Sequence, residues 1–229
     1  MIFTDKKLII FDLDGTLINS APDLALAVNH MLSSLGRECF SQITIDGWVG
    51  NGASMLTRRA LSASVIIDEH LDEDLCQRAL SIFLDFYAQN LCIETISYPH
   101  VKMTLSSLQQ RGYRLALVTN KPFAFVAPIL EGLGLEGFFE LCLGGDSLSE
   151  RKPHPMPLLH VCEKLNITID NAVMVGDSKN DILSAKACKM QSIGLTYGYN
   201  YAEAISTYEP EFVFDDFAKL LDVFKESSC

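Results

Sequence analysis

Two aspartates end an apolar run near the start of the chain. Residues 7–11 (Lys-Leu-Ile-Ile-Phe) predict a short buried strand, and Asp12 and Asp14 follow it directly. Because side chains two residues apart in extended chain point to the same side, one carboxylate can attack phosphorus while the other transfers a proton to the leaving oxygen. Gly15 permits a sharp turn, and Thr16 can offer a hydroxyl or a backbone N–H to a phosphate.

Further polar residues follow other predicted strands. Thr119 and Asn120 come after a strand around residues 115–118, and Lys152 lies beyond the strand 141–143. Asp177 and Asp181 follow the strand 172–176, four residues apart, which predicts that they share one face of a helix near its N-terminus. Ligands bind at the carboxyl ends of strands in open α/β sheets, so we expect all these groups to converge at one edge.

The convergence of carboxylates points to a metal and to phosphate. Four acids at one edge, Asp12, Asp14, Asp177 and Asp181, would repel one another. A divalent cation relieves that repulsion, and Mg²⁺ prefers oxygen ligands, retained water and substrate phosphate. Lys152 would neutralise further charge. An acidic centre with a lysine and a hydroxyl is suited to phosphoryl transfer, in which positioning and charge neutralisation dominate.

The elements that would position these residues alternate between strand and helix. Such alternation indicates a parallel sheet with right-handed crossovers, that is, an α/β fold. The first strand is followed instead by an all-helical block, so we expect a helical insertion at residues 18–95 and an α/β core made of residues 1–17 and 96–229. The predicted core strands are 7–11, 114–119, 141–143, 172–176, 192–195 and 212–214, and the predicted helices are 22–36, 53–61, 71–91, 123–130, 157–165, 181–188 and 217–224.

Composition narrows the classes of function. The 229 residues are 48% hydrophobic, which is typical of a globular chain. Their net charge of −11 argues against the broad basic surface of a nucleic-acid binder. No apolar run is long enough for a membrane helix or a signal peptide, so neither a membrane nor a nucleic-acid partner is expected. The seven cysteines are scattered, with no Cys-x-x-Cys, which favours reduced thiols and a cytoplasmic location.

Four motifs in order resemble the haloacid dehalogenase superfamily of phosphatases. They are residues 12–17 (Asp-Leu-Asp-Gly-Thr-Leu), 119–120 (Thr-Asn), 152–153 (Lys-Pro) and 176–181 (Gly-Asp-Ser-Lys-Asn-Asp). The resemblance covers nearly the whole chain. It implies a Rossmann-like core of a parallel sheet flanked by helices, with a mobile helical cap inserted after the first strand, and Mg²⁺ as cofactor.

The resemblance also implies roles for individual residues. Asp12 would form an aspartyl-phosphate, and Asp14 would act as general acid and base with its backbone carbonyl on Mg²⁺. Thr119 and Lys152 would hold the phosphoryl oxygens. Metal ligation would fall to Asp177, with Asp181 in support. The superfamily's dehalogenases, which attack carbon, do not use the second aspartate, so its presence favours a phosphate ester as substrate.

The insertion narrows the substrate further. Residues 20–24, 48–52, 59–61 and 98–99 resemble the corresponding stretches of phosphoglycolate phosphatases, although His100 stands where a Gly is expected. The implied substrate is a small phosphorylated acid, 2-phosphoglycolate, bound by Gly15, Thr16, Asn51, Arg59 and Asn120. Arg59 could pair with its carboxylate, but it lies about two helical turns (roughly 10 Å) beyond Gly52 and could equally serve cap packing.

The sequence leaves three hypotheses about the function open. The first is a Mg²⁺-dependent phosphatase of small phosphorylated acids. The second is a sugar-phosphate mutase, or a broad sugar or nucleotide monophosphatase, on the same fold, because the core motifs do not separate these activities. The third is a non-catalytic sensor of a phosphorylated ligand. The sequence does not decide between a monomer and a homodimer.

Overall fold

The apolar run that precedes Asp12 forms strand β1 (Leu8–Phe11), and all four of its residues are buried. The computed structural model describes residues 3–201 and 203–225. In it β1 lies in the interior of a six-stranded parallel sheet and is covered on both faces, which explains why its sequence is apolar throughout rather than alternating. The predicted α/β fold with a parallel sheet is confirmed.

The sheet brings the ends of its strands into register. Its strand order is β5-β4-β1-β6-β7-β8, and Phe11 pairs with Leu117 on one side and with Val175 on the other. The residues that follow β1, β4 and β6 therefore emerge at one edge. The other strands are β4 (Arg114–Val118), β5 (Leu141–Leu143), β6 (Ala172–Gly176), β7 (Gln191–Leu195) and β8 (Phe212–Phe214).

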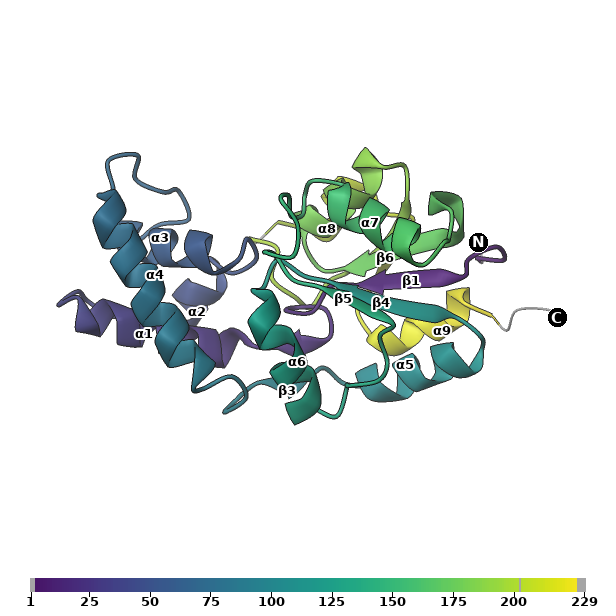
Figure 1. Ribbon diagram of the computed structural model, residues 1–229, viewed down its shortest axis with the longest axis horizontal. Helices are drawn as coiled ribbons and strands as arrows, with labels where there is room; N and C mark the ends of the chain where they lie inside the picture. The colour runs from purple at the N-terminus through teal and green to yellow at the C-terminus, as the bar shows by residue number, and fades with distance from the viewer. Residues whose placement is uncertain (1–2, 202, 226–229) are drawn as a thin grey trace.

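Helices cover both faces of the sheet (Figure 1). Alternate residues of β1 point to opposite sides: Leu8 and Ile10 join the apolar cluster that includes Leu158 and Val161 of α7, and Ile9 and Phe11 join the larger cluster on the other face. The core helices are α5 (Val101–Gln110), α6 (Phe123–Gly132), α7 (Met156–Lys164), α8 (Lys179–Ala187) and α9 (Leu220–Val223), with 3₁₀ turns at Ile169–Asn171, Ile205–Tyr208 and Phe217–Lys219.

Between β1 and β4 the chain builds a separate group of helices, which we call the helical insertion: α1 (Ala21–Ser34), α2 (Gln42–Asp46), α3 (Ala53–Ser62) and α4 (Glu73–Ala88). It lies beyond the edge of the sheet, at the left of Figure 1. A short antiparallel pair, β2 (Ile18–Asn19) and β3 (Ile96–Ser97), carries the chain out and back. The buried carboxylate of Asp23 accepts hydrogen bonds from three successive backbone N–H groups, those of residues 93–95, and so ties α1 to the returning segment.

Several predicted elements differ from those observed. The helix expected at 71–91 is α4, which begins and ends two to three residues inside those limits, and the helix expected at 217–224 is a 3₁₀ turn followed by the single turn of α9. The helices α2 and α5 were not predicted. No helix in the described part of the chain is long and apolar enough to cross a membrane. Of the seven cysteines, the six that are described are free thiols, and Cys229 lies outside the described residues.

Candidate active site

Asp12 and Lys152 form the centre of the site at the sheet edge. Lys152 Nζ lies 2.8 Å from Asp12 Oδ1 and 2.6 Å from Asp181 Oδ1, and it also donates to the Val118 carbonyl at 2.6 Å. The Lys152 side chain is 1% exposed. Burial alone disfavours its ammonium, but the two carboxylates outweigh that effect and raise the pKa of Lys152. This lysine therefore stays charged inside the protein.

Asp177 is held in place by two neighbouring segments, the turn at residues 15–16 and the loop that contains Tyr199. Its Oδ1 accepts a hydrogen bond from the Thr16 hydroxyl at 2.6 Å, and its Oδ2 accepts from the Tyr199 backbone N–H at 2.6 Å. Gly15 has φ +87°, and a Cβ added there would lie 2.2 Å from Asp177 Oδ2. The turn after Asp14 thus requires glycine twice, once for its left-handed backbone and once for the space that Asp177 fills.

The placement of Asp177 and Asp181 corrects one prediction. They do not share a helix face, because α8 begins at Lys179 and Asp177 lies in the loop before it. Asp181 is instead the third residue of the helix, where its Oδ2 accepts hydrogen bonds from the backbone N–H and the hydroxyl of Ser178. This reciprocal cap fixes the carboxylate and leaves its other oxygen for Lys152.

The acidic cluster fits a bound cation. Asp12, Asp177 and Asp181 are all buried, and each offers an oxygen within 4.8 Å of the others. Burial, and then the neighbouring Asp181, raise the pKa of Asp12 to about 7 against the opposing effect of Lys152. Burial and the same carboxylates raise the pKa of Asp177 well above its usual range.

Asp12 offers an atom suited to such a cation. Among residues 3–201 and 203–225, its buried Oδ1 contacts the Lys152 ammonium at 2.8 Å and accepts no further hydrogen bond. Buried carboxylate oxygens with a single donor, and raised carboxyl pKa values, are what a hard divalent cation would relieve.

Asp14 lies outside that cluster and has a partner that the sequence reasoning missed. Its Oδ1 accepts from the Ser20 hydroxyl and from Lys121 Nζ, the latter at 2.9 Å. The Lys121 side chain is 2% exposed, and its ammonium lies 4.7 Å from the centroid of the Tyr87 ring of α4. Lys121 could have been found from the sequence, because it directly follows Thr119 and Asn120 at the end of a predicted strand.

Thr119 and Asn120 lie where the strand-end argument predicts. Thr119 is buried at the end of β4, and its hydroxyl accepts the backbone N–H of Lys121 at 3.2 Å. The Asn120 amide donates to the Lys152 carbonyl at 2.9 Å and to the Gly50 carbonyl at 3.5 Å. Asn120 thus connects two motifs of the core and contacts the helical insertion.

Arg59 and Asn51 are placed differently from a substrate clamp. The Arg59 guanidinium donates to the Trp48 carbonyl at 2.7 Å, to Asn51 Oδ1 at 2.7 Å and to the Val65 carbonyl, and it does not line the pocket beside Asp12. Asn51 Oδ1 also accepts from the Tyr201 hydroxyl of the core. The contacts of Arg59 are therefore those of a residue that packs within the insertion. Asn51 connects the insertion to the core.

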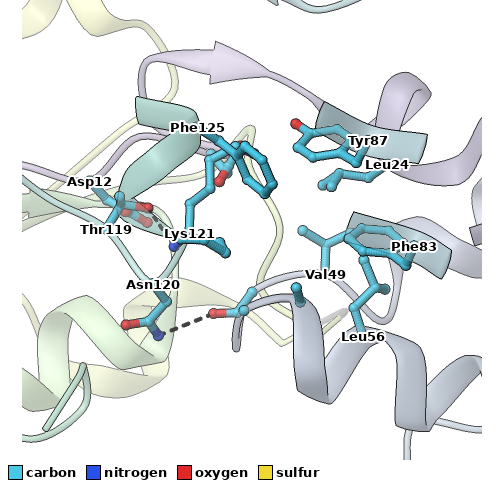
Figure 2. A pocket seen from close by; sticks show the side chains of 15 residues that line it. Asp12, Leu24, Val49, Leu56, Phe83, Tyr87, Thr119, Asn120, Lys121 and Phe125 are labelled. Atoms are coloured by element: carbon cyan, nitrogen blue, oxygen red, sulfur yellow. Dashed lines mark hydrogen bonds and ion pairs between the residues drawn. The ribbon is translucent and has the colours of Figure 1, made fainter. Parts of the chain in front are cut away.

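A pocket lies between the sheet edge and the helical insertion (Figure 2). Asp12, Asp14, Thr119, Asn120 and Lys121 line its core side. Its other walls are apolar side chains, most of them from the insertion: Leu24, Val49, Leu56, Phe83, Tyr87 and, from α6, Phe125. Figure 2 shows the ring of Tyr87 and the side chain of Phe83 on the side opposite Asp12. A ligand held at the carboxylates would be enclosed by hydrocarbon.

Comparison with known proteins places this chain in a family. Residues 9–195 match the model of the haloacid dehalogenase-like hydrolases. A phosphoglycolate phosphatase from Colwellia psychrerythraea is 55% identical over 96% of this chain and 98% of its own length, and one from Psychrobacter arcticus is 49% identical over 95% of each chain. The crystal structure of a predicted phosphoglycolate phosphatase from Haemophilus somnus has a TM-score of 0.89 and 42% identity, covering 96% of this chain and 99% of that one. The chain therefore belongs to the haloacid dehalogenase-like hydrolases.

Proposed function

We propose that this protein is a Mg²⁺-dependent phosphatase that hydrolyses 2-phosphoglycolate to glycolate and phosphate. The observation that carries the proposal is the juxtaposition of Asp12, Asp177 and Asp181 with Lys152 in a chain whose relatives, matched over nearly their full length, are named phosphoglycolate phosphatases. The proposed partner is thus a small phosphate ester. The described cysteines, all free thiols, support the cytoplasmic location that we expect from the sequence.

The residues of the chain supply the nucleophile and the proton donor. A carboxylate oxygen of Asp12 attacks phosphorus in line, forming an aspartyl-phosphate while the bond to the leaving oxygen breaks. Asp14 gives its proton to that oxygen and then takes a proton from the water that attacks phosphorus in the second step. The second step releases phosphate and restores Asp12. Lys152 offsets charge on the phosphoryl oxygens, and the Thr119 hydroxyl holds one of them.

The metal would be held by residues of the same edge. Asp12 and Asp177 offer carboxylate oxygens, and Asp14 offers its backbone carbonyl, while Asp181 supports the site through Lys152 and Ser178. When bound, Mg²⁺ would supply positive charge to the phosphate and to Asp12. Thr16 and Gly15 position Asp177 for this role.

The pocket favours a small acid over a sugar or nucleoside phosphate. Its cavity volume is about 50 Å³, which is room for roughly three to five water-sized groups at ~10–15 Å³ each. The part of 2-phosphoglycolate beyond the phosphate is one methylene carbon and a carboxylate, whereas a hexose or nucleoside exceeds this space. We propose that residues 18–95 act as a cap that closes over this substrate, with residues 1–17 and 96–229 as the catalytic core.

A substrate panel tests the proposal. With Mg²⁺, we expect kcat/KM for 2-phosphoglycolate to exceed that for glucose 1-phosphate and for a nucleoside monophosphate. Asp12→Asn should reduce turnover of every substrate to background while the protein stays folded. Steady turnover by the Asp12→Asn protein, or a preference for the sugar or nucleoside phosphate, would contradict the proposal. If the native protein hydrolyses none of these substrates, the hypothesis of a non-catalytic sensor of a phosphorylated ligand would be favoured.

A further inference from the structure

Lys121 is buried beside the proposed active site, but the reaction proposed above gives it no role. Its side chain is almost fully buried between Asp14 of the core and the Tyr87 ring of the helical insertion. Burying an ammonium in a mostly apolar pocket is costly unless its donors are used. An ammonium has three N–H donors. Asp14 takes one of them, and the ring face of Tyr87 provides a further favourable contact.

The pocket wall makes Lys121 distinctive. Among the described residues that line the pocket, it carries the one cationic side chain. The remaining side chains are the polar groups at the sheet edge and hydrocarbon from the insertion and α6, as Figure 2 shows. Any anionic group of a ligand that projects away from Asp12 into this pocket must be neutralised by Lys121 or remain buried without a counter-charge.

Two other cations near the site, Lys152 and Arg59, are already committed. Lys152 contacts the carboxylates of Asp12 and Asp181 and the Val118 carbonyl, and it lies beside the phosphate position. Arg59 donates to groups of the insertion, and its guanidinium lies 5.0 Å from the Tyr201 ring centroid, away from the pocket. A ligand with a phosphate at one end and a second anion at the other therefore meets one cation at each end.

We propose that Lys121 is the specificity-determining residue that binds the carboxylate of the substrate. The proposal rests on the function proposed above and adds to it the group that recognises the acid. In this arrangement Asp14 orients the ammonium from the core, and Tyr87 covers it from the insertion. Packing of the insertion onto the core therefore completes the carboxylate site. The substrate class is a phosphomonoester whose carboxylate is separated from the ester oxygen by one carbon.

The experiment compares two substrates that differ in the carboxylate. The kcat/KM values of 2-phosphoglycolate and of ethyl phosphate are measured with Mg²⁺ for the native protein and for Lys121→Met. Loss of the contact with Asp14 lowers both values, so the ratio of the two isolates recognition of the carboxylate. Because Lys121 carries the one cationic side chain among the described pocket residues, we expect the preference for 2-phosphoglycolate over ethyl phosphate to fall by about 30-fold or more, which is about 2 kcal/mol.

Two further variants sharpen the comparison. Lys179→Met is the matched control, since Lys179 also lies over a tyrosine ring, at 4.8 Å from the centroid of Tyr201, and pairs with Glu203, but it does not line the pocket. The ratio of its kcat/KM values for 2-phosphoglycolate and ethyl phosphate should equal that of the native protein. Where Lys121→Met fails to fold, as judged by thermal unfolding, Lys121→Gln supplies the same comparison without the charge.

The outcomes separate this inference from the function on which it depends. Equal losses for both substrates in Lys121→Met would overturn the inference and assign Lys121 to positioning Asp14. A native protein that hydrolyses ethyl phosphate as well as 2-phosphoglycolate would also overturn it, while leaving phosphatase activity in place. A native protein that hydrolyses neither ester would refute the proposed function itself.

Discussion

Replacing the proposed nucleophile should make the metal-free protein more stable. Asp12 is buried beside Asp177 and Asp181, with Lys152 as the ammonium that contacts it. Without a bound cation, the folded protein must hold these charges close together in a poorly solvated place. Asp12→Asn removes one of them and keeps the size of the side chain. We therefore expect this variant to have a larger free energy of unfolding than the native protein in EDTA at pH 8.

The size of the effect follows from the pKa of Asp12. Burial raises it from 3.8 to about 7, roughly 3 pH units at 1.36 kcal/mol each, which sets a ceiling of about 4 kcal/mol. Between about pH 4 and pH 7 the folded state holds a proton that the unfolded state has lost. Stability from this group is therefore complete below pH 4 and is lost as the pH rises through 7.

Asparagine gives up part of that gain. The pKa of about 7 already includes the opposing effect of Lys152, but burying the asparagine amide has its own cost, so we expect a net stabilisation of about 1–3 kcal/mol at pH 8. At pH 4 the native Asp12 is neutral in the folded state, and the advantage of Asp12→Asn should nearly vanish.

Urea unfolding in EDTA at pH 4 and pH 8 measures these differences. Mg²⁺ at 100 times its dissociation constant should stabilise the native protein by about 2.7 kcal/mol and the Asp12→Asn protein by less, because a ligand oxygen is altered. Asp222→Asn, at an exposed position, is the matched control and should change little under any condition. If Asp12→Asn is less stable than the native protein in EDTA at pH 8, the electrostatic reasoning about this cluster is wrong.

Three other substitutions probe the supports of the site. Gly15→Ala should abolish activity and weaken Mg²⁺ binding, measured by calorimetry, because its Cβ would lie 2.2 Å from Asp177 Oδ2. Asp23→Asn should lower the free energy of urea unfolding by about 2–4 kcal/mol, because three backbone N–H groups lose a charged acceptor. Tyr201→Phe, which removes a hydroxyl donor to Asn51, should reduce kcat/KM by about 3- to 10-fold through a looser contact between insertion and core. An unchanged kcat/KM would show that the hydroxyl of Tyr201 does not support activity through that contact.

The acids of the site could be located from the sequence because strand ends are a local signal. A run such as 8–11 is buried on both faces, and the first polar residue after it marks the sheet edge. The same reasoning located Thr119 and Asp177, since β1, β4 and β6 are neighbours in the sheet. Assigning Asp177 to the following helix was wrong, because the exact start of α8 depends on the Ser178 cap rather than on periodicity.

Lys121 and Arg59 show what local patterns do not contain. Both are cations near a motif, but only tertiary contacts decide which of them faces the pocket. Lys121 is buried because Tyr87, from a distant part of the chain, covers it. Arg59 turns away because carbonyls of its own insertion use its donors. The two-residue strands β2 and β3 are too short to carry any periodic signal.

His100 shows how a departure from the expected residue is accommodated. Its φ of +66° lies in the left-handed region, which explains why glycine is expected there. Its imidazole Nδ1 lies 2.9 Å from Asp216 Oδ1, and this contact lowers the pKa of Asp216. A side chain at this position thus gains a partner that glycine would lack, which offsets part of the backbone cost.

The charges of the site connect the metal, the substrate and the insertion. At the sheet edge the carboxylates of Asp12, Asp14, Asp177 and Asp181 outnumber the ammonium groups of Lys121 and Lys152 by two. A divalent cation balances that excess. Burial, and then the neighbouring carboxylates, raise the pKa values of Asp12 and Asp177, and a bound cation would oppose both effects. A substrate with two anionic ends then needs one cation at each end. Because Lys121 is enclosed by Tyr87 of the insertion, binding of the second end should depend on closure of the insertion over the core.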